Sequence, residues 1–453
     1  AITTWAGRVH AIDLVHTELD KPTDKWTTLL AGLAELGVFG AALPERLGGA
    51  GAQLIDVAAM VERCGYQLVP GPIGPTVVAA LALARSDDHR ASRLAESIGA
   101  GELPVSTPAA VYAAASAPEL VGGAVDVGDV AGHTDAGALL LRLRVAGRDG
   151  WWLLPPGVGT IEIGEPVSAD GLTSVSRVRC AGIDVDDLIG LPDVDLVSGG
   201  LSGMLAAYQS GVCRRALDTA VEYAKIRTQF GVPIGSFQAV KHICADMACR
   251  TEQVTAAAWD LARALDEYCA AATASDTASA SDGVSASDGV SGSDGVSGSG
   301  GVSGSGEQLE ISRLAADILV ADLPVTVTED CIQVLGGIGF TFEHDAHLYL
   351  RAALTARSAL DHARRQRVEL ARRGGPGGVR RRFSIDLSDV EDRRAEVRAT
   401  VAEIAARPVD QRRAALADTG FLTPHWPRPF GLDASPALQL LIDAELDAAG
   451  VVR

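Results

Sequence analysis

RTQFGVPIGSFQ, residues 227–238, separates two long segments whose apolar residues recur at helical spacing. Gly231 and Pro233 interrupt that spacing, which predicts a turn between two helices. Arg227 then lies near a helix end, and a guanidinium group there suits a phosphate-bearing ligand because it can bind two phosphate oxygens at once. The alternative is that Arg227 is a solvated or helix-capping residue. An arginine in a loop, taken alone, favours this alternative. A second glycine motif, QVLGGIGF at residues 333–340, follows later in the chain.

The two motifs together resemble the C-terminal helical domain of the acyl-CoA dehydrogenase family. In that family the RxQFG and QxxGG segments reach the adenosine diphosphate end of an FAD that is held mainly by the neighbouring subunit. The resemblance implies a mainly α fold with a small β-domain: an N-terminal helical domain, a middle β-domain and a C-terminal four-helix bundle. It implies FAD as the cofactor, bound by Arg227, Gln229, Phe230, Phe237, Gln238, Gln333, Gly336 and Gly337.

The composition is that of a globular protein, with 47% hydrophobic and 21% charged residues among 453. The net charge of −19 argues against a general nucleic-acid binder. The seven cysteines form no CxxC pair, which is typical of reduced thiols in a cytoplasmic protein. No segment has the apolar length of a membrane span and no signal peptide opens the chain, so we expect a cytoplasmic location.

Hydrophobic periodicity divides the chain into domains. Residues 1–100 have helical spacing, and residues 101–195 carry short apolar runs separated by Gly, Pro and Asp, which is typical of strands. Residues 196–373 predict an antiparallel four-helix bundle, in which Pro324 should kink or end one helix. Residues 270–306 interrupt the bundle with a low-complexity tract that repeats Ser-Asp-Gly-Val-Ser-Gly, which predicts a flexible linker. A calcium-binding Gly-Asp repeat is the less favoured alternative, because the tract lacks alternating large apolar residues.

The C-terminal part of the chain repeats its N-terminal part. Glycines and the basic cluster Arg380-Arg381-Arg382 predict a linker over residues 374–382 with solvated arginines. Beyond it, residues 383–453 match the beginning of the chain at a constant offset of 383 positions: Gly37, Pro44, Gly48 and Glu62 recur as Gly420, Pro427, Gly431 and Glu445. We therefore expect the start of a second N-terminal helical domain. The whole resembles the fused, tandem acyl-CoA dehydrogenases that are linked to steroid side-chain breakdown.

The family's reaction implies an acyl-CoA substrate and a carboxylate base, usually Glu. The base takes the α-proton while the β-hydrogen leaves as hydride to the flavin. Counting by the family's spacing leads to Leu360 and, for the alternative site, to Leu201, and neither is an acid. Asp361 is the nearest substitute, although one residue along a helix turns a side chain by about 100°. The alternative is a helix-surface aspartate beside Arg364 and Arg365.

Other residues carry weaker signals. The family's Thr-Glu-Pro and Gly-Ser-Asp flavin loop is absent, and residues 104–108 with an alanine-rich run stand in its place. Trp151 and Trp152 could stack on a flavin, but a paired aromatic in a strand is more often core and sheet surface. His344 and His347, with their acidic neighbours, are better explained by a helix start than by a metal site.

The motifs that reach a neighbour's FAD are intact, whereas the residues that would use a flavin in this chain's own pocket are degenerate. This asymmetry predicts a helper half that completes the FAD site of a second acyl-CoA dehydrogenase unit in a homo- or hetero-oligomer. An electron-transfer protein would be the acceptor, and a reshaped pocket would suit a bulky acyl group such as a steroid side chain. The alternatives are a flavin-dependent acyl-CoA oxidase or monooxygenase of the same fold, or a scaffold that binds no flavin.

Overall fold

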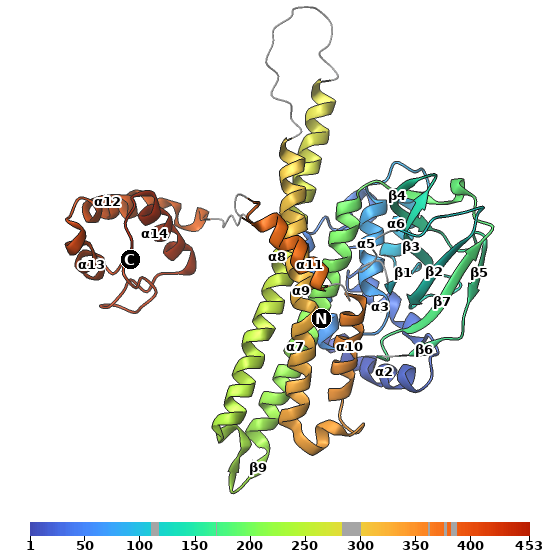
Figure 1. Cartoon of the computed structure of the whole chain (residues 1–453), viewed down its shortest axis with the longest axis horizontal. Helices are drawn as coiled ribbons and strands as arrows, with labels where there is room; N and C mark the ends of the chain where they lie inside the picture. Colours follow the sequence, from blue (N-terminus) through green and yellow to red (C-terminus); the bar gives the residue numbers. More distant parts are fainter. Residues whose placement is uncertain (110–116, 169, 283–299, 361–362, 376–377, 382–386) are drawn as a thin grey trace, which may run out of the picture. The chain divides into compact units, whose positions relative to one another are not determined.

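The computed structural model describes the whole chain except residues 110–116, 169, 283–299, 361–362, 376–377 and 382–386. It consists of two compact units, Ala1–Arg381 and Arg382–Arg453, each with hydrophobic clusters of its own. The first unit is mainly helical with one sheet, as the sequence predicts (Figure 1).

Short helices form the N-terminal part of the first unit. Trp26 and Leu33 are fully buried there. The helix that carries Leu33 ends at Glu35, because Gly37 takes a left-handed φ of +83° that side chains disfavour. The elements are α1 (Ile2–Arg8), α2 (Ala11–Asp20), η1 (Lys25–Leu29), α3 (Leu30–Glu35), η2 (Glu45–Leu47), α4 (Leu54–Tyr66), α5 (Ile73–Leu83) and α6 (Ala91–Gly99).

The described strands of the middle part form one sheet in the order β5-β7-β2-β1-β3-β4-β8, with β6 also paired to β7. Strand β1 runs parallel to β3, and the other pairings are antiparallel. Trp151 is core, as predicted: it is buried, and its indole N–H donates to Ser198 Oγ at 3.1 Å. The strands are β1 (Val105–Pro108), β2 (Val125–Ala131), β3 (Ala138–Val145), β4 (Arg148–Leu154), β5 (Thr160–Ile163), β6 (Val167–Ser168), β7 (Ser174–Ala181) and β8 (Ile189–Leu191).

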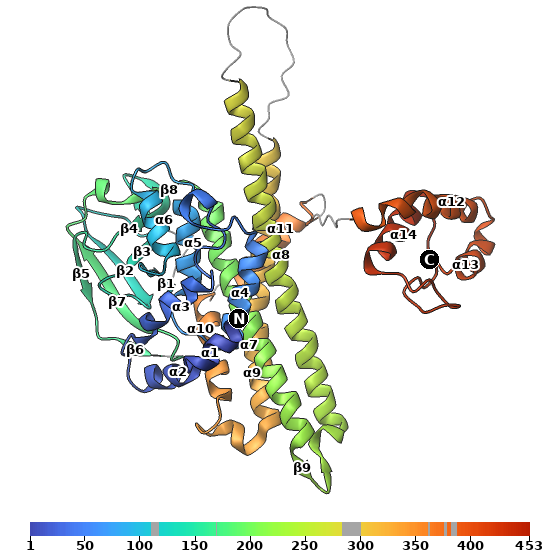
Figure 2. The same ribbon diagram turned by 180° about the vertical axis from the view of Figure 1, so that it is seen from behind.

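An antiparallel helix bundle follows, and the N-terminal helices and the sheet lie on one flank of it (Figures 1 and 2). Small residues let its helices approach closely: a Cβ on Gly65 of α4 would collide with the carbonyl of Tyr208, and one on Gly211 would collide with that of Glu62. The bundle consists of α7 (Val194–Ile226), α8 (Gln238–Asp282), α9 (Gly300–Leu335) and α10 (Ala346–Ala359), and α11 (Ala363–Gly374) packs on α9.

The prediction of a linker over residues 270–306 is corrected. Helix α8 continues to Asp282 and α9 begins at Gly300, so helix occupies both ends of the linker predicted for residues 270–306. Alanine-rich residues favour extension of α8, and each glycine added to an existing helix costs only about 1 kcal/mol. Pro324 was predicted to kink or end a helix, and the helix does not end there: α9 continues past it, with Ala321 and Val325 on either side buried in the bundle.

The predicted linker after the bundle is partly docked rather than solvated. Arg381 is 15% exposed by its side chain and lies 3.0 Å from a carboxylate oxygen of Asp260 and 2.8 Å from one of Glu267. The amide of Gln308 donates to the carbonyl of Arg380 at 2.8 Å. The expectation of solvated arginines is therefore wrong for Arg381, because two acids of α8 attract it.

The second unit, Arg382–Arg453, is a small helical domain with its own core. Its elements begin close to 383 positions after elements of the first unit: α12 (Arg394–Ala405) corresponds to α2, α13 (Val409–Asp418) to η1 and α3, and α14 (Pro436–Ala448) to α4, with η7 (Ser388–Arg393) before them. Gly37 and Gly420 both take left-handed φ angles, +83° and +74°. Leu416, which corresponds to Leu33, is fully buried.

Candidate functional site

The turn at residues 227–238 is a short hairpin between two helices. Helix α7 ends at Ile226, β9 (Thr228–Gln229) pairs with β10 (Val232–Pro233), and η5 (Ile234–Ser236) leads into α8. Phe230 and Gly231 take left-handed φ angles of +50° and +81°, as a tight hairpin turn requires. The backbone N–H of Ile234 donates to the carbonyl of Arg227 at 2.8 Å and closes the loop.

The side chains of this hairpin point to solvent. Phe230 is 92% exposed, and Phe237 meets it edge-on with ring centroids 6.1 Å apart. Arg227 and Gln229 are exposed, and within the described residues their side chains have no hydrogen-bond or ion-pair partner. Gln238 lies beside His242, with side-chain nitrogens 2.8 Å apart. Exposed arginines are common on protein surfaces, but two aromatic rings that contact each other at the surface form a candidate contact area for another molecule.

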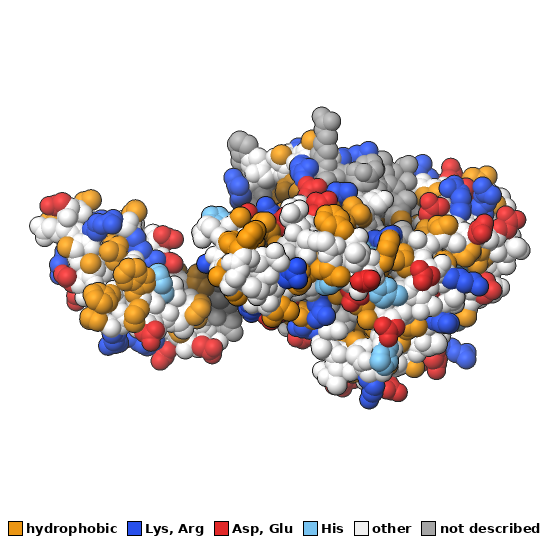
Figure 3. Space-filling model, turned by 90° about the horizontal axis from the view of Figure 1, so that it is seen from below, with side chains coloured by type: hydrophobic (Ala, Val, Ile, Leu, Met, Phe, Trp, Pro, Cys, Tyr) orange, Lys and Arg blue, Asp and Glu red, His pale blue; other side chains and the backbone are white. Residues whose placement is uncertain are grey.

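The second glycine motif lies at the same end of the bundle (Figure 1). It forms η6 (Gly336–Phe340), where Gly336 has a φ of +62° and a Cβ on Gly337 would meet open space. Ile338 packs on the same hydrophobic cluster as Ile234, so the two motifs share one support. Gln333 and Gly337 are exposed, as are the rings of Phe340 and Phe342. Seen from below, this end of the first unit presents several hydrophobic groups (Figure 3).

A cavity of about 180 Å³ lies where the N-terminal helices, the sheet and the bundle meet. Its walls are mostly apolar and come from distant parts of the chain: they include Val61 of α4, Ile73 of α5, Thr107 of β1, Met204 and Gln209 of α7, and Ala356 and Ala359 of α10. An apolar pocket with a few polar groups at a junction of domains is the usual form of a small-molecule site.

No acid occupies either position to which the family's spacing leads. Leu360 is 1% exposed in the bundle core, and Leu201 is 2% exposed among the residues that join α7 to the N-terminal helices. Asp361 lies outside the described residues. Among the residues that the structure describes, the carboxyl that lines the cavity is that of Asp170, from the loop between β6 and β7.

Asp170 is held by its surroundings rather than free. It is 5% exposed and accepts the backbone N–H of Leu172 at 2.9 Å and the hydroxyl of Thr355. Burial raises the pKa of its carboxyl, and these hydrogen bonds oppose that rise. Asp170 could not be identified from the sequence, since nothing in its local sequence relates it to Thr355 of α10.

Tyr208 and Gln209 of α7 were missed as cavity residues for a different reason. Tyr208 recurs with the apolar residues of this helix, so its spacing predicts core rather than a cavity wall. Its hydroxyl donates to Val69 O at 3.1 Å, and burial raises its pKa well above the ordinary value. Gln209 is 2% exposed, and a glutamine within so apolar a helix was the available signal.

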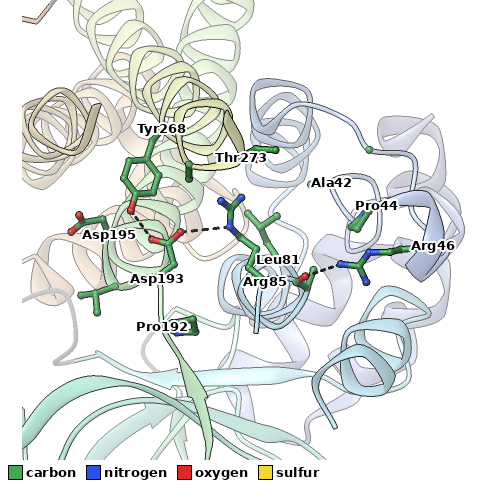
Figure 4. A pocket seen from close by; sticks show the side chains of 14 residues that line it. Ala42, Pro44, Arg46, Leu81, Arg85, Pro192, Asp193, Asp195, Tyr268 and Thr273 are labelled. Atoms are coloured by element: carbon green, nitrogen blue, oxygen red, sulfur yellow. Dashed lines mark hydrogen bonds and ion pairs between the residues drawn. The ribbon is translucent and has the colours of Figure 1, made fainter. Parts of the chain in front are cut away.

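A second, larger cavity of about 840 Å³ lies at the opposite end of α7 (Figure 4). Arg85 and Tyr268 both point at Asp193, and the tyrosine hydroxyl donates to it at 2.9 Å. Asp193 also accepts the N–H of Leu196 and so caps α7. Helix α7 has 33 residues, so about 50 Å separates this cavity from the glycine motifs. None of the residues assigned by the resemblance lines it.

The histidines after the second glycine motif serve the start of α10. His344 Nδ1 accepts the N–H of Ala346 at 3.0 Å, and Asp345 lies 2.9 Å from His16 Nε2. His347 has two buried ring nitrogens without a hydrogen-bond partner, and burial lowers its pKa. Across the described ranges, no three or more His, Cys, Asp or Glu side chains are placed to share a metal ion.

Two of the buried cysteines have protonated thiols. Burial raises the pKa of Cys64 and of Cys331 to about 12, so both stay protonated and unreactive at neutral pH. Cys249, by contrast, is exposed.

Among the helices that the structure describes, none combines the length and the apolarity needed to cross a bilayer.

Comparisons with known proteins agree with the geometry. A model of the acyl-CoA dehydrogenase C-terminal domain matches residues 202–281. Acyl-CoA dehydrogenase FadE34 of Mycobacterium tuberculosis is 41% identical over 435 residues, and the chain spans 53% of its length. The solved ChsE4–ChsE5 complex from the same organism has the same fold, with a TM-score of 0.60 at 24% identity over 83% of this chain and 98% of that chain. Acyl-CoA dehydrogenase IpdE2 of M. tuberculosis is 30% identical over 334 residues, which cover 73% of this chain and 81% of that protein. The chain belongs to the acyl-CoA dehydrogenase family.

Proposed function

We propose that this chain is the helper half of an FAD-dependent acyl-CoA dehydrogenase and completes the FAD site of a second unit. The observation that carries the proposal is the separation of the glycine motifs from the chain's own cavity. Arg227 follows Gln209 by 18 residues along α7, a distance of about 27 Å. An arginine side chain cannot span that distance, so the exposed hairpin serves a ligand outside this cavity.

The residues at the motif end fit the adenosine diphosphate part of FAD. Arg227 offers a guanidinium without a partner in the described structure, which matches the planar fork that phosphate oxygens accept. Gln229 and Gln333 add exposed amide groups, and the open space at Gly337 leaves room for a ligand beside the backbone. Phe230 and Phe237 offer apolar surface for an adenine ring.

The cavity of this chain supports the helper role. The flavin of the complete site would accept the hydride, and a carboxylate would have to take the α-proton. Both positions expected for that carboxylate are buried leucines, Leu360 and Leu201. Asp170 accepts hydrogen bonds from a backbone N–H and from Thr355, which hold its carboxyl in the wall of the cavity. Asp361, the nearest acid in sequence to Leu360, lies outside the described residues. We propose that the base lies in the second acyl-CoA dehydrogenase unit.

The second acyl-CoA dehydrogenase unit is proposed to lie in the same polypeptide. Residues 383–453 would begin its N-terminal helical domain, which the matching positions of α12 and α14 with α2 and α4 support. The relative FadE34 is about twice as long as the aligned region, which agrees with a tandem arrangement. The proposed substrate is an acyl-CoA with a bulky acyl group of the steroid side-chain type, the proposed acceptor is an electron-transfer protein, and the proposed location is the cytoplasm.

The test is the visible spectrum of this purified chain beside the same chain followed by a complete second unit. The proposal expects flavin absorbance only in the extended form, with bleaching when an acyl-CoA is added. Flavin bound and bleached by this chain alone would refute the helper role. Oxygen consumption in place of transfer to an electron carrier would instead assign the pair to the oxidases.

A further inference from the structure

The C-terminal unit, Arg382–Arg453, holds three large hydrophobic side chains in solvent. Val409 at the start of α13 is 77% exposed, and Trp426 and Phe430 of the loop before α14 are 50% and 69% exposed. None of the three belongs to the hydrophobic cluster that forms the core of this unit. Several large apolar groups in solvent on one small domain favour a surface that another segment covers.

The loop that carries the two aromatic rings has the backbone fold of its counterpart in the first unit. Trp426 lies 383 positions after Leu43, and the carbonyl of each accepts one backbone N–H from later in its own loop, at 2.8 and 2.9 Å. The carbonyls of Pro424 and Ala41, which are related by the same offset, each accept a backbone N–H at 2.9 Å. Side chains at matching positions of the two loops are therefore directly comparable.

Each exposed residue has a buried counterpart 383 positions earlier, and these counterparts are Trp26, Leu43 and Leu47, exposed by 0%, 1% and 5%. One segment of the first unit covers all three. A Cβ on Gly71 would lie 3.1 Å from the ring of Trp26. A Cβ on Gly99 would lie 2.9 Å from a methyl group of Leu43, and η2, which carries Leu47, packs on α6. The covering segment, residues 71–99, contains α5 and α6.

We infer that Val409, Trp426 and Phe430 form a docking surface for a helix pair equivalent to α5 and α6, supplied by the second acyl-CoA dehydrogenase unit. The inference rests on the proposed function, because it takes the C-terminal unit as the start of that second unit. A second copy of this chain cannot supply its own α5 and α6, since their apolar residues, such as Val78 and Ile98, are already buried in the core of the first unit.

The test is hydroxyl-radical footprinting, read by mass spectrometry, of the 453-residue chain beside the same chain followed by a complete second unit. In the shorter form Trp426 should be oxidised as readily as Trp259 of α8, which is 43% exposed. In the extended form oxidation of Phe430 should fall to the level of Phe421, a ring that is 6% exposed in the core of the C-terminal unit, and oxidation of Trp426 should fall with it.

A pair of variants adds a second measurement. Phe430→Ser should lower the melting temperature of the extended form and leave that of the 453-residue chain unchanged, because the ring contacts no core in the shorter form. Phe421→Ser is the matched control and should lower the melting temperature of both forms, since it removes a core ring.

Rings that stay oxidised in the extended form would overturn the inference. Rings that are already protected in the 453-residue chain would overturn it too, and protection that grows with protein concentration would assign the surface to a second copy. The flavin absorbance of the same extended sample separates this result from the proposed function. Protected rings without flavin would uphold the docking surface and refute the helper role, whereas bound flavin with oxidised rings would refute the docking surface alone.

Discussion

Replacing Arg227 by glutamine should weaken FAD binding in the assembled protein and leave the folding of this chain unchanged. The side chain is exposed and has no partner in the described structure, so its removal breaks no internal contact. A hydrogen bond between charged groups contributes about 1.5–3 kcal/mol, which corresponds to an increase of roughly 10- to 150-fold in the dissociation constant of FAD.

The assay is flavin content per protein, from the visible absorbance of this chain joined to a complete second unit, together with a titration of the apoprotein with FAD. Lys225→Gln is the matched control, since it removes a cation two residues away whose partner is Glu222 at 2.6 Å. The melting temperatures of both variants should equal that of the wild type. If Arg227→Gln binds FAD as tightly as Lys225→Gln does, the hairpin does not contact the cofactor and the cross-unit reasoning fails.

Three further predictions concern stability. Gly211→Ala places a Cβ against the backbone of α4 and should cost about 1–3 kcal/mol in thermal or urea unfolding, whereas Gly337→Ala, which faces open space, should cost less. Arg381→Ala should cost about 1 kcal/mol, because its two ion pairs are partly exposed, and faster proteolysis at residues 378–381 would report the released segment. Burial lowers the pKa of His133 in the folded state. Below the ordinary histidine pKa of about 6.5 the unfolded chain therefore binds more protons than the folded chain, and the free energy of unfolding should fall from pH 7 to pH 5. His133→Leu should show a smaller fall in urea unfolding, and an equal fall would exclude His133 as a contributor.

The sequence predicts the local architecture well because local chemistry decides it. Gly231 and Pro233 cannot continue a helix, and the chain does turn between two helices there. The apolar run at residues 138–145 becomes β3, and Trp151 is buried as core. At Pro324 the sequence left a kink and a helix end open, and the helix continues because tertiary packing of Ala321 and Val325 outweighs the loss of one backbone hydrogen bond.

The cavity could not be predicted, because its walls come from segments that only the fold brings together. Asp170 meets Thr355 across 185 positions of sequence, and Gln209 meets Ala352 across 143. The hydrogen bond from Arg381 to Asp260 likewise joins residues 121 positions apart. Periodicity reports which face of a helix is buried, but it does not report which polar atom on that face lacks a partner.

Glu62 and Glu445, which are related by the constant offset of 383 positions, have different hydrogen-bond donors. Glu62 of α4 accepts from Ser210 and Trp259, both of the bundle, each at 3.1 Å. Glu445 of α14 is also buried but accepts from Arg394 and Arg398 of α12, at 2.7 and 2.8 Å, and these two arginines lower its pKa to about 2.

In the first unit, the residues 383 positions before those arginines are Ala11 and Val15, both buried and apolar. A buried carboxylate must be paired, so Glu62 and Glu445 are each satisfied by a different set of donors. In residues 382–453, the arginines that neutralise Glu445 lie on α12 of the same unit, so no helix bundle is needed. Glu62, by contrast, depends on donors from the bundle. We therefore expect the 382–453 unit to fold when expressed alone, with Arg398→Ala and Glu445→Gln each destabilising it in urea. An unfolded fragment would show that Glu445 needs partners beyond α12.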